Sequence, residues 1–514
     1  MNGAESLVRT LVAGGVDVCF TNPGTSEMHF VAALDRVEGM RCVLGLFEGI
    51  VTGAADGYYR MKGTPASTLL HLGPGLANGL ANLHNAKKAN SGIVNIVGQH
   101  AVYHIEYNAP LTSDIEGLAR PMSHWVRTSP DAKSVAKDGA AAIAAASAAP
   151  GQIATLILPA DTAWNEADGI AQVQHDQQKP TYSPQAVDGA AKILKSGEPT
   201  LLLLTGSALT EAGLDLAERI AAKTNCKVMG QTYNPRMARG RGRFHIERIP
   251  YVIESALPIL KDFKNIILIE ANDPVAFFAY PNKPSLLKPE GCNVHRMTAG
   301  GENSVAALEA LAGAVGAKAA DVKPVQKPEP VKPTGALSHA SIAAAIAYAI
   351  PENAIVVDES ITTGRGFFPP TAASKPHDWL QNMGGSIGFS TPVSTGAAVA
   401  CPDRKVICMV GDGSAMYTIQ SLWTQAREQL DVVTIVFANR IYQILRGEFD
   451  GVGAGQPGQK ALDMLKIDNP ALDFVSLAKG MGVPGRAVDN VDDFNVALAA
   501  AIAHKGPYLI EVRF

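Results

Sequence analysis

The stretch MVGDGSAMYTIQSLWTQAREQLDVVTIVFANRIY, residues 409–442, places polar residues at the ends of two apolar runs. The first run is followed by Gly-Asp-Gly-Ser, and the second is followed by Asn439. The pattern between the runs predicts one crossover helix over residues 417–429. A strand, this helix and a second parallel strand would bring Asp412 and Asn439 to the same edge of a sheet, where ligands bind in open α/β folds.

The two residues at this edge are suited to a metal ion. A carboxylate and an amide carbonyl are hard oxygen donors, which favour Mg²⁺ or Ca²⁺. Two side chains do not make a closed cage, so further oxygens must come from elsewhere, and a diphosphate would supply them. The backbone N–H groups of Gly411, Gly413 and Ser414 add an anion site at a helix start. The alternative for the turn taken alone is a tight turn with a helix cap; Asn439 at the matching position favours the metal site.

Length and composition limit the class of protein. A chain of 514 residues suggests about three domains. Lys and Arg number 44 against 48 Asp and Glu, for a net charge of -4. This balance predicts neither a nucleic-acid surface nor a basic membrane-binding face.

The start of the chain and the cysteines predict a cytoplasmic protein. The sequence MNGAESLVRTLVAGGVDVCF lacks the basic start and the continuous apolar core of a signal peptide. No stretch reaches the roughly 18 to 20 apolar residues of a membrane span. The six cysteines have no CxxC spacing, which favours reduced thiols over a disulfide framework or a zinc site.

Two connectors divide the chain into three predicted domains. Residues 166–185 are polar with Pro-containing turns, and residues 316–335 are rich in Lys and Pro. The predicted domains are residues 1–165, 186–316 and 336–514. Each contains short β-branched apolar runs that alternate with helical patterns, such as TLLLLTGS, NAIVVDES and YLIEVRF. Strands of this kind are buried on both faces, so the predicted fold is α/β, with mostly parallel sheets flanked by helices.

Glu48 is a second candidate functional residue. It lies among apolar neighbours in LGLFEGIVTGAADGYYR, where an unpaired carboxylate is costly to bury. The alternative is a glutamate at the exposed end of a strand.

These two features together resemble the thiamine diphosphate-dependent enzymes. The turn at Asp412, followed by a helix, an apolar strand and Asn439, is similar to the metal-diphosphate motif of that family. The resemblance implies that Asp412, Asn439 and the main-chain oxygen of Ile441 hold Mg²⁺ against the cofactor diphosphate, with Tyr442 also at the cofactor. It implies that Glu48 hydrogen-bonds the aminopyrimidine ring and helps to activate the cofactor.

Further resemblance spans essentially the whole chain and is greatest to benzoylformate decarboxylase and acetolactate synthase-like proteins. Thr25 in TNPGTSEMHF would lie near the substrate carboxylate, and Gln99 matches a position that often lines these sites. In NMGGSIGFSTP, residues 382–392, the Gly385 carbonyl and the side chain of Ile387 would support the bent cofactor. Thr362 in DESITTG would contact the diphosphate side.

Three histidines and one tyrosine are further residues of interest. His71 precedes Gly-Pro-Gly and is expected to act as an acid or base and to donate to the substrate carboxylate, although a structural histidine is the alternative. His100 and His104 are expected to be exposed loop residues. Benzoylformate decarboxylases have a second catalytic histidine in the middle domain, where this chain aligns Tyr280. A phenol with a pKa near 10 cannot replace an imidazole as a proton shuttle without a large shift.

The resemblance implies decarboxylation of a 2-oxo acid, followed by release of an aldehyde or by carboligation. The alternatives are an acetolactate synthase-type carboligase and a paralogue that has lost catalysis. The middle domain has a Rossmann-like turn, TGSALTEAG, without GxGxxG, so FAD is not supported but is not excluded. The family forms its site between two subunits, which implies at least a homodimer and leads us to expect a homotetramer.

Overall fold

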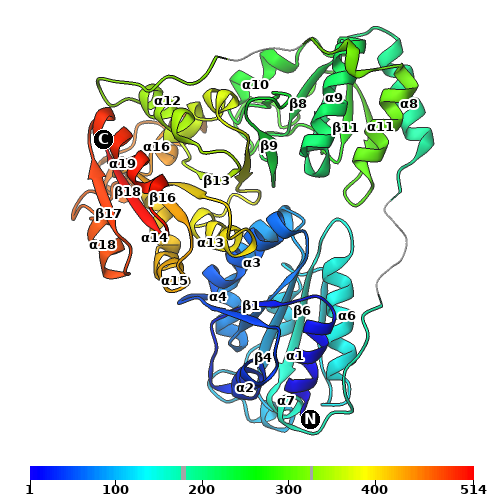
Figure 1. The fold of residues 1–514 in the computed structure, drawn as a ribbon, viewed down its shortest axis with the longest axis vertical. Helices are drawn as coiled ribbons and strands as arrows, with labels where there is room; N and C mark the ends of the chain where they lie inside the picture. Colours follow the sequence, from blue (N-terminus) through cyan, green and yellow to red (C-terminus); the bar gives the residue numbers. More distant parts are fainter. Residues whose placement is uncertain (175–180, 324–327) are drawn as a thin grey trace.

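The computed structural model describes residues 1–174, 181–323 and 328–514. Parts of both predicted connectors, residues 166–185 and 316–335, lie outside the described residues. Figure 1 shows a first domain in blue and cyan, a middle domain in green and a third domain in yellow to red. Each is built on its own sheet, so the predicted three-domain α/β fold is confirmed.

The first domain has a six-stranded parallel sheet in the order β2-β1-β3-β4-β6-β5. Its strands are β1 (Val18–Thr21), β2 (Arg41–Leu44), β3 (Ala66–Leu70), β4 (Ile93–Gln99), β5 (Trp125–Thr128) and β6 (Ile153–Pro159). Its helices are α1 (Gly3–Ala13), α2 (Met28–Arg36), α3 (Glu48–Lys62), α4 (Leu72–Lys88), α5 (Ile115–Ala119), α6 (Val135–Ser147) and α7 (Ala160–Trp164), with 3-10 turns η1 (Thr25–Glu27) and η2 (Val102–Tyr107).

Burial along the strands follows their place in this sheet. Every residue of β3, β4 and β6 is buried, because helices cover both faces of the central strands. The edge strands β2 and β5 contain exposed residues.

The middle domain has a five-stranded sheet in the order β10-β8-β7-β11-β12. Its strands are β7 (Thr200–Leu204), β8 (Lys227–Gly230), β10 (Glu247–Arg248), β11 (Asn265–Ile269) and β12 (Asn293–Thr298). Its helices are α8 (Pro184–Lys195), α9 (Glu211–Thr224), α10 (Ile253–Leu260) and α11 (Ser304–Val315), with 3-10 turns η3 (Gly206–Leu209) and η4 (Ala319–Asp321).

The third domain has a seven-stranded sheet in the order β17-β18-β16-β15-β13-β14-β9. Its strands are β13 (Ala354–Glu359), β14 (His377–Gln381), β15 (Val406–Gly411), β16 (Val432–Ala438), β17 (Gly485–Val488) and β18 (Tyr508–Arg513), and they pair in parallel. The seventh strand, β9 (Met237–Arg239), comes from the middle segment of the chain and pairs antiparallel with β14. This sheet therefore connects the middle and third domains.

Helices cover the third sheet and line its edge. They are α12 (His339–Ala349), α13 (Ser390–Ala400), α14 (Asp412–Thr418), α15 (Ser421–Arg427), α16 (Gln443–Gly451), α17 (Gln459–Leu465), α18 (Phe474–Gly480) and α19 (Val491–Ala503), with 3-10 turns η5 (Thr363–Gly366) and η6 (Pro370–Ala373).

The prediction of a single crossover helix over residues 417–429 is wrong. The chain forms α14 and α15 instead, and α14 already begins at Asp412. The carbonyl of Thr418 accepts a bond from the Thr391 hydroxyl at 3.1 Å, and the Thr418 hydroxyl donates to the Gly388 carbonyl at 2.9 Å. These contacts hold the end of α14 against the start of α13 and the residue Gly388 before it, so one continuous helix does not form.

The first and third domains meet where α3 packs against α13. A Cβ atom added to Gly57 would lie 2.1 Å from the Val393 carbonyl oxygen, and one added to Gly396 would lie 1.8 Å from the Ala54 carbonyl oxygen. Only residues without a side chain allow the two backbones to approach this closely.

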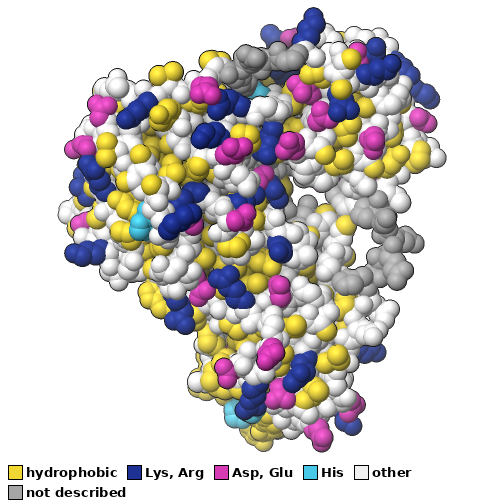
Figure 2. All heavy atoms as spheres, viewed as in Figure 1, with side chains coloured by type: hydrophobic (Ala, Val, Ile, Leu, Met, Phe, Trp, Pro, Cys, Tyr) yellow, Lys and Arg dark blue, Asp and Glu magenta, His cyan; other side chains and the backbone are white. Residues whose placement is uncertain are grey.

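Charged side chains are spread over the molecule. In Figure 2, basic and acidic side chains are interspersed on the visible face. In the described part of the chain, no helix combines the length and apolar character needed to cross a membrane.

Candidate active site

Four predicted site residues lie at the carboxyl edge of the first sheet. Thr25 follows β1, Glu48 follows β2, His71 follows β3, and Gln99 ends β4. These strands are neighbours in the order β2-β1-β3-β4 and are parallel. Residues far apart in the sequence are thereby brought to one edge.

His71 forms a side-chain contact with a residue that the sequence did not single out. Its Nδ1 lies 2.9 Å from Oε2 of Glu27, whose side chain is 1% exposed. The Glu27 carboxylate also accepts bonds from the Gly24 backbone N–H at 2.8 Å and from the Ser26 hydroxyl at 2.5 Å. A carboxylate beside Nδ1 favours the tautomer that carries its proton there. Nε2 would then be the ring nitrogen available to another partner.

Glu48 is the first residue of α3 and is 8% exposed, so the alternative of an exposed glutamate at a strand end is wrong. Its Oε2 accepts a bond from the Asn78 side chain at 3.0 Å. A negative side chain is favoured in the first turn of a helix. A Cβ atom added to Gly75 would lie 3.1 Å from Oε1 of Glu48 and 3.3 Å from Cβ of His71. Gly75 thus leaves room for the carboxylate and the imidazole residue to approach each other.

The other polar residues of this edge have distinct surroundings. Thr25 is exposed, and Gln99 is buried and accepts a bond from the His100 backbone N–H at 2.8 Å. The ring centroids of His100 and His104 are 5.4 Å apart. Burial, and then the neighbouring His104 and His71, lower the pKa of His100. His100 is only half-buried, and His104 is exposed as expected.

Asp412 and the Asn439–Ile441 turn come together at the edge of the third sheet. Strands β15 and β16 are parallel neighbours, and Oδ2 of Asp412 accepts the Arg440 backbone N–H at 2.5 Å. Burial raises the pKa of Asp412, while the N–H groups of Arg440 and Gly413 oppose that shift. Oδ1 of Asn439 accepts the Ile441 N–H at 3.1 Å, and the Ile441 carbonyl accepts the Gln443 N–H at 2.8 Å.

The remaining residues of this motif surround the same turn. Ser414 is buried in α14, and Gly411 is the residue before that helix. A Cβ atom added to Gly413 would lie 2.4 Å from the Tyr442 ring, so this ring packs directly on the turn. The described residues include no group of three or more His, Cys, Asp or Glu side chains that could bind a metal. A cation held by Asp412, Asn439 and a carbonyl would need further oxygens from a ligand.

The segment that carries Gly385 and Ile387 is held by a carboxylate that sequence reasoning missed. Glu359, at the end of β13, accepts the backbone N–H groups of Gly388 at 2.9 Å, Phe389 at 3.0 Å and Ser390 at 2.8 Å. Burial raises the pKa of Glu359 to about 7, against the opposing effect of these bonds. Ile387 is half-buried and Gly385 is exposed with a φ of +77°, a conformation that favours glycine.

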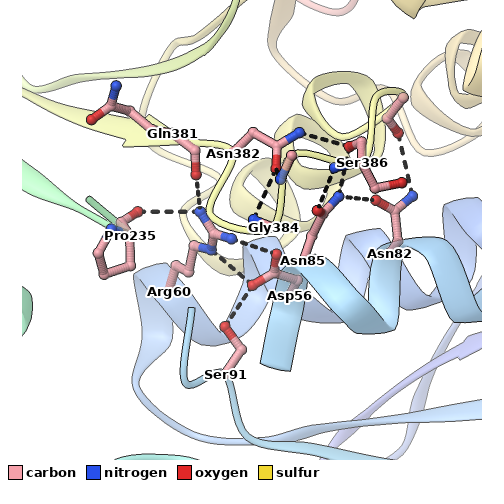
Figure 3. Close-up of polar contacts among 12 residues, drawn as sticks. Asp56, Arg60, Asn82, Asn85, Ser91, Pro235, Gln381, Asn382, Gly384 and Ser386 are labelled. Carbon is pink, nitrogen blue, oxygen red and sulfur yellow. Dashed lines mark hydrogen bonds and ion pairs between the residues drawn. The ribbon is translucent and has the colours of Figure 1, made fainter. Parts of the chain in front are cut away.

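Helix α4 of the first domain contacts the same segment, as Figure 3 shows. Asn82 donates to the Gly49 carbonyl at 2.8 Å and to the Gly388 carbonyl at 3.3 Å. Asn85 donates to the Ser386 carbonyl at 2.9 Å. The turn at Gly388 is thereby fixed to the helix start that carries Glu48.

A buried ion pair supports this junction. Arg60 bonds both oxygens of Asp56, at 2.8 and 2.7 Å, and donates to the Gln381 carbonyl at 2.6 Å. Ser91 donates to Asp56 at 2.5 Å. Because every charged group here has partners, the pair joins α3 to β14 without an unpaired buried charge.

Thr362 lies on a strained loop. It follows Ile361, whose φ of +48° is rare for a β-branched residue. Such strain is common at binding sites, where surrounding contacts hold it in place. Thr362 is half-buried and precedes η5.

The middle domain contributes Tyr280, and its Rossmann-like turn is bonded to the carboxylate of Glu270. The Tyr280 hydroxyl donates to Glu448 of α16 at 3.2 Å. In the turn, the Ser207 N–H donates to Oε1 of Glu270 at 3.1 Å. Burial raises the pKa of Glu270. The backbone N–H of Ser207 in this turn is therefore already bonded to a side chain of the protein.

Two family models match the two halves of this site. Residues 1–120 match the N-terminal TPP binding domain of thiamine pyrophosphate enzymes, and residues 367–512 match their C-terminal TPP binding domain. The benzoylformate decarboxylase of Pseudomonas aeruginosa is 30% identical over 97% of this chain and 96% of its own. This chain belongs to the thiamine pyrophosphate enzyme family. Thiamine pyrophosphate is the thiamine diphosphate of the sequence motif, so the predicted family is confirmed.

Two further relatives of this thiamine pyrophosphate enzyme carry different names. A Mycobacterium tuberculosis protein named "Putative acetolactate synthase large subunit IlvX" is 50% identical over 100% of this chain and 99% of its own. The solved 4-hydroxybenzoylformate decarboxylase of Rhodococcus jostii RHA1 has a TM-score of 0.87 and 27% identity, over 100% of this chain and 99% of its own. The relatives thus include proteins named as decarboxylases and one named as a putative acetolactate synthase.

Proposed function

We propose that this thiamine pyrophosphate enzyme decarboxylates a 2-oxo acid, with Mg²⁺ bound to the cofactor diphosphate. The observation that carries the proposal is the arrangement of Glu48, Gly75 and the Glu27–His71 pair at one edge of the first sheet. It combines a buried carboxylate with an imidazole whose Nδ1 contacts a second buried carboxylate. The cofactor, when bound, supplies the electron sink that loss of carbon dioxide requires.

The residues of the third domain fit this cofactor. Asp412, Asn439 and the Ile441 carbonyl would provide oxygen ligands for Mg²⁺, and Ca²⁺ would suit the same donors. Gly413, Ser414 and Thr362 would contact the diphosphate. Gly385 and Ile387 would support the pyrimidine side of the cofactor, on the segment that Glu359 fixes.

The residues of the first domain would move protons. Glu48 would exchange a proton with the pyrimidine ring, because it is buried, with one carboxylate oxygen bonded to Asn78. His71 would hold its Nδ1 proton toward Glu27 and use Nε2 as donor or acceptor to the substrate. Thr25 and Gln99 would contact the substrate carboxylate and the pocket wall.

The favoured product is an aldehyde, because His71 can supply the proton that completes its release. Carboligation to a second 2-oxo acid is the other candidate, and the 50% identical relative named as an acetolactate synthase favours it. Both outcomes begin with loss of carbon dioxide from a 2-oxo acid.

We also propose that the complete site contains two chains, with Glu48 of one subunit facing Asp412 of another. At least a homodimer is then required, and the expected assembly is a homotetramer. Thiamine pyrophosphate enzymes form oligomers as a family, which supports this proposal.

Product analysis tests the reaction. The purified protein, loaded with thiamine pyrophosphate and Mg²⁺, is given pyruvate or benzoylformate, and the products are identified by chromatography. Aldehyde alone supports the decarboxylase, whereas acetolactate without aldehyde supports the carboligase. No turnover of any 2-oxo acid by protein that retains the cofactor would contradict both and favour a paralogue without catalysis.

A further inference from the structure

Four aromatic residues of the middle domain form a bridge to the third domain. This aromatic bridge consists of Tyr233, Tyr251, Phe277 and Tyr280. The ring centroid of Phe277 lies 5.9 Å from that of Tyr233 and 5.5 Å from that of Tyr251. Such distances are typical of aromatic pairs that stabilise a contact beyond simple burial.

One end of the aromatic bridge contacts the segment predicted to support the cofactor. A Cβ atom added to Gly385 would lie 2.7 Å from Cζ of Phe277. The ring therefore packs against the backbone of Gly385, in the turn whose carbonyl is a predicted cofactor contact.

The other end of the aromatic bridge contacts helix α16 through a shared acceptor. The hydroxyls of Tyr280 and Tyr251 lie 3.2 and 3.4 Å from the same oxygen of Glu448. Burial raises the pKa of Tyr280; a hydrogen bond with Tyr251 opposes this shift, and the bond to Glu448 adds to it. The phenol therefore stays protonated at neutral pH and donates to the carboxylate. Hydrogen bonds to a charged acceptor are stronger than those between neutral groups.

Helix α16 lies near the surface of the molecule. None of its residues, Gln443–Gly451, is fully buried. Its start is bonded to the 439–442 turn, since the Gln443 N–H donates to the Ile441 carbonyl. A helix without a buried face depends on a small number of contacts for its position, so loss of one of them should be felt at the turn.

We propose that Glu448, held by Tyr251 and Tyr280, is a positioning residue that fixes α16 and through it the 439–442 turn. Tyr280 then acts through Glu448 and transfers no proton. The identity of the ligand held at the turn rests on the proposed function; the coupling between Glu448 and the turn does not.

The coupling is tested first without any ligand. Hydrogen exchange of peptides that cover residues 439–451 is compared between the wild type and the variants Glu448→Ala, Tyr280→Phe and Tyr251→Phe/Tyr280→Phe. Tyr348→Phe is the matched control, because this tyrosine is exposed on α12. We expect exchange in residues 439–451 to rise about three- to tenfold in Glu448→Ala and in the double Tyr variant, and to stay unchanged in the control.

The second arm measures the equilibrium dissociation constant of thiamine pyrophosphate with Mg²⁺. We expect it to rise about three- to tenfold in the same two variants, and Glu448→Gln, which keeps an acceptor, to recover part of the loss. Tyr280→Phe should cause no further loss in the Glu448→Ala background, because both changes remove the same hydrogen bond. If turnover is measurable, KM should change, whereas kcat and its pH profile should not.

Three results would overturn the proposal. They are unchanged hydrogen exchange in residues 439–451, additive effects of Tyr280→Phe and Glu448→Ala, or a fall in kcat with an altered pH profile in Tyr280→Phe. The last would make Tyr280 a proton donor. A protein that binds the cofactor with the expected coupling but turns over no 2-oxo acid would contradict the proposed function alone.

Discussion

The Glu27 carboxylate lies 2.9 Å from Nδ1 of His71, although the two residues are 44 positions apart in the sequence. The pair forms because β1 and β3 are neighbours in the sheet, so the loops that follow them meet. His71 is thereby given a fixed orientation. This relationship distinguishes it from a histidine that only fills space at a strand end.

Replacing Glu27 by Gln should lower kcat/KM about 10- to 100-fold. The change removes a charged acceptor, and bonds to charged groups contribute about 1.5 to 3 kcal/mol. Cofactor binding should be unchanged. Steady-state kinetics across pH measures this. Glu5→Gln is the matched control, because Glu5 pairs with the exposed Arg36; an equal loss in both variants would contradict the assignment.

Glu48→Gln should keep the cofactor bound but slow its activation. The amide retains a hydrogen bond with Asn78 but cannot exchange a proton with the pyrimidine ring. The measurement is deuterium exchange at the thiazolium C2 of bound thiamine pyrophosphate, followed by NMR after acid quench. We expect a fall of at least about 100-fold. An unchanged exchange rate would refute the role of Glu48.

Asp412→Ala should abolish metal-dependent retention of the cofactor. The change removes a charged metal ligand and the acceptor for the Arg440 N–H. Gel filtration of protein loaded with thiamine pyrophosphate and Mg²⁺, with and without EDTA, measures retention. Asp403→Ala, at an exposed loop position, is the control. Normal retention by the Asp412 variant would show that the metal lies elsewhere.

Mixing two inactive variants tests whether the site lies between chains. In a dimer of Glu48→Gln and Asp412→Ala chains, one of the two sites combines an intact Glu48 with an intact Asp412. Activity should therefore reappear when the variants are co-refolded or co-expressed with different tags. Purified mixed dimers that stay as inactive as either parent would contradict the proposal that the site lies between two chains.

Glu359 should make stability depend on pH. Burial raises its pKa from the ordinary 4.5 to about 7, so the folded protein holds the proton more tightly than the unfolded chain. The stabilising contribution is fully present below about pH 4.5 and is lost as pH rises through about 7. Glu359→Gln should flatten the fall in unfolding free energy across this window, by up to ~1.4 kcal/mol per pH unit.

Urea unfolding at several pH values measures that slope. Glu352→Gln, an exposed position, is the control and should behave as the wild type. Equal slopes in wild type and Glu359→Gln would show that Glu359 is ionised throughout the range.

The sequence predicted the central strands because they are apolar on both faces, as in β16, where every residue is buried. It did not predict β9, which is three residues long and joins a sheet built mainly by a later part of the chain. It also did not predict the break between α14 and α15, which depends on hydroxyl bonds from Thr391 and Thr418.

The site residues also divide into those with a local sequence pattern and those that depend on contacts with other segments. Asp412, Asn439 and Glu48 stand in motifs whose spacing reflects strand ends, so the sequence indicated them. Glu27, Glu359 and Glu448 act through partners that folding brings from other segments, and their local sequence carries no such pattern. In the sequence, Glu27 is marked only as an acidic residue in the segment that also contains Thr25.

The most direct test of the account is release of labelled carbon dioxide from carboxyl-labelled pyruvate and benzoylformate. The wild-type protein is first shown to retain thiamine pyrophosphate and Mg²⁺, and Glu48→Gln serves as the loaded comparison. We predict catalytic release of label by the wild type from at least one 2-oxo acid, and at least about 100-fold slower release by the variant. Equal release by both proteins, or none by the loaded wild type, would contradict the account.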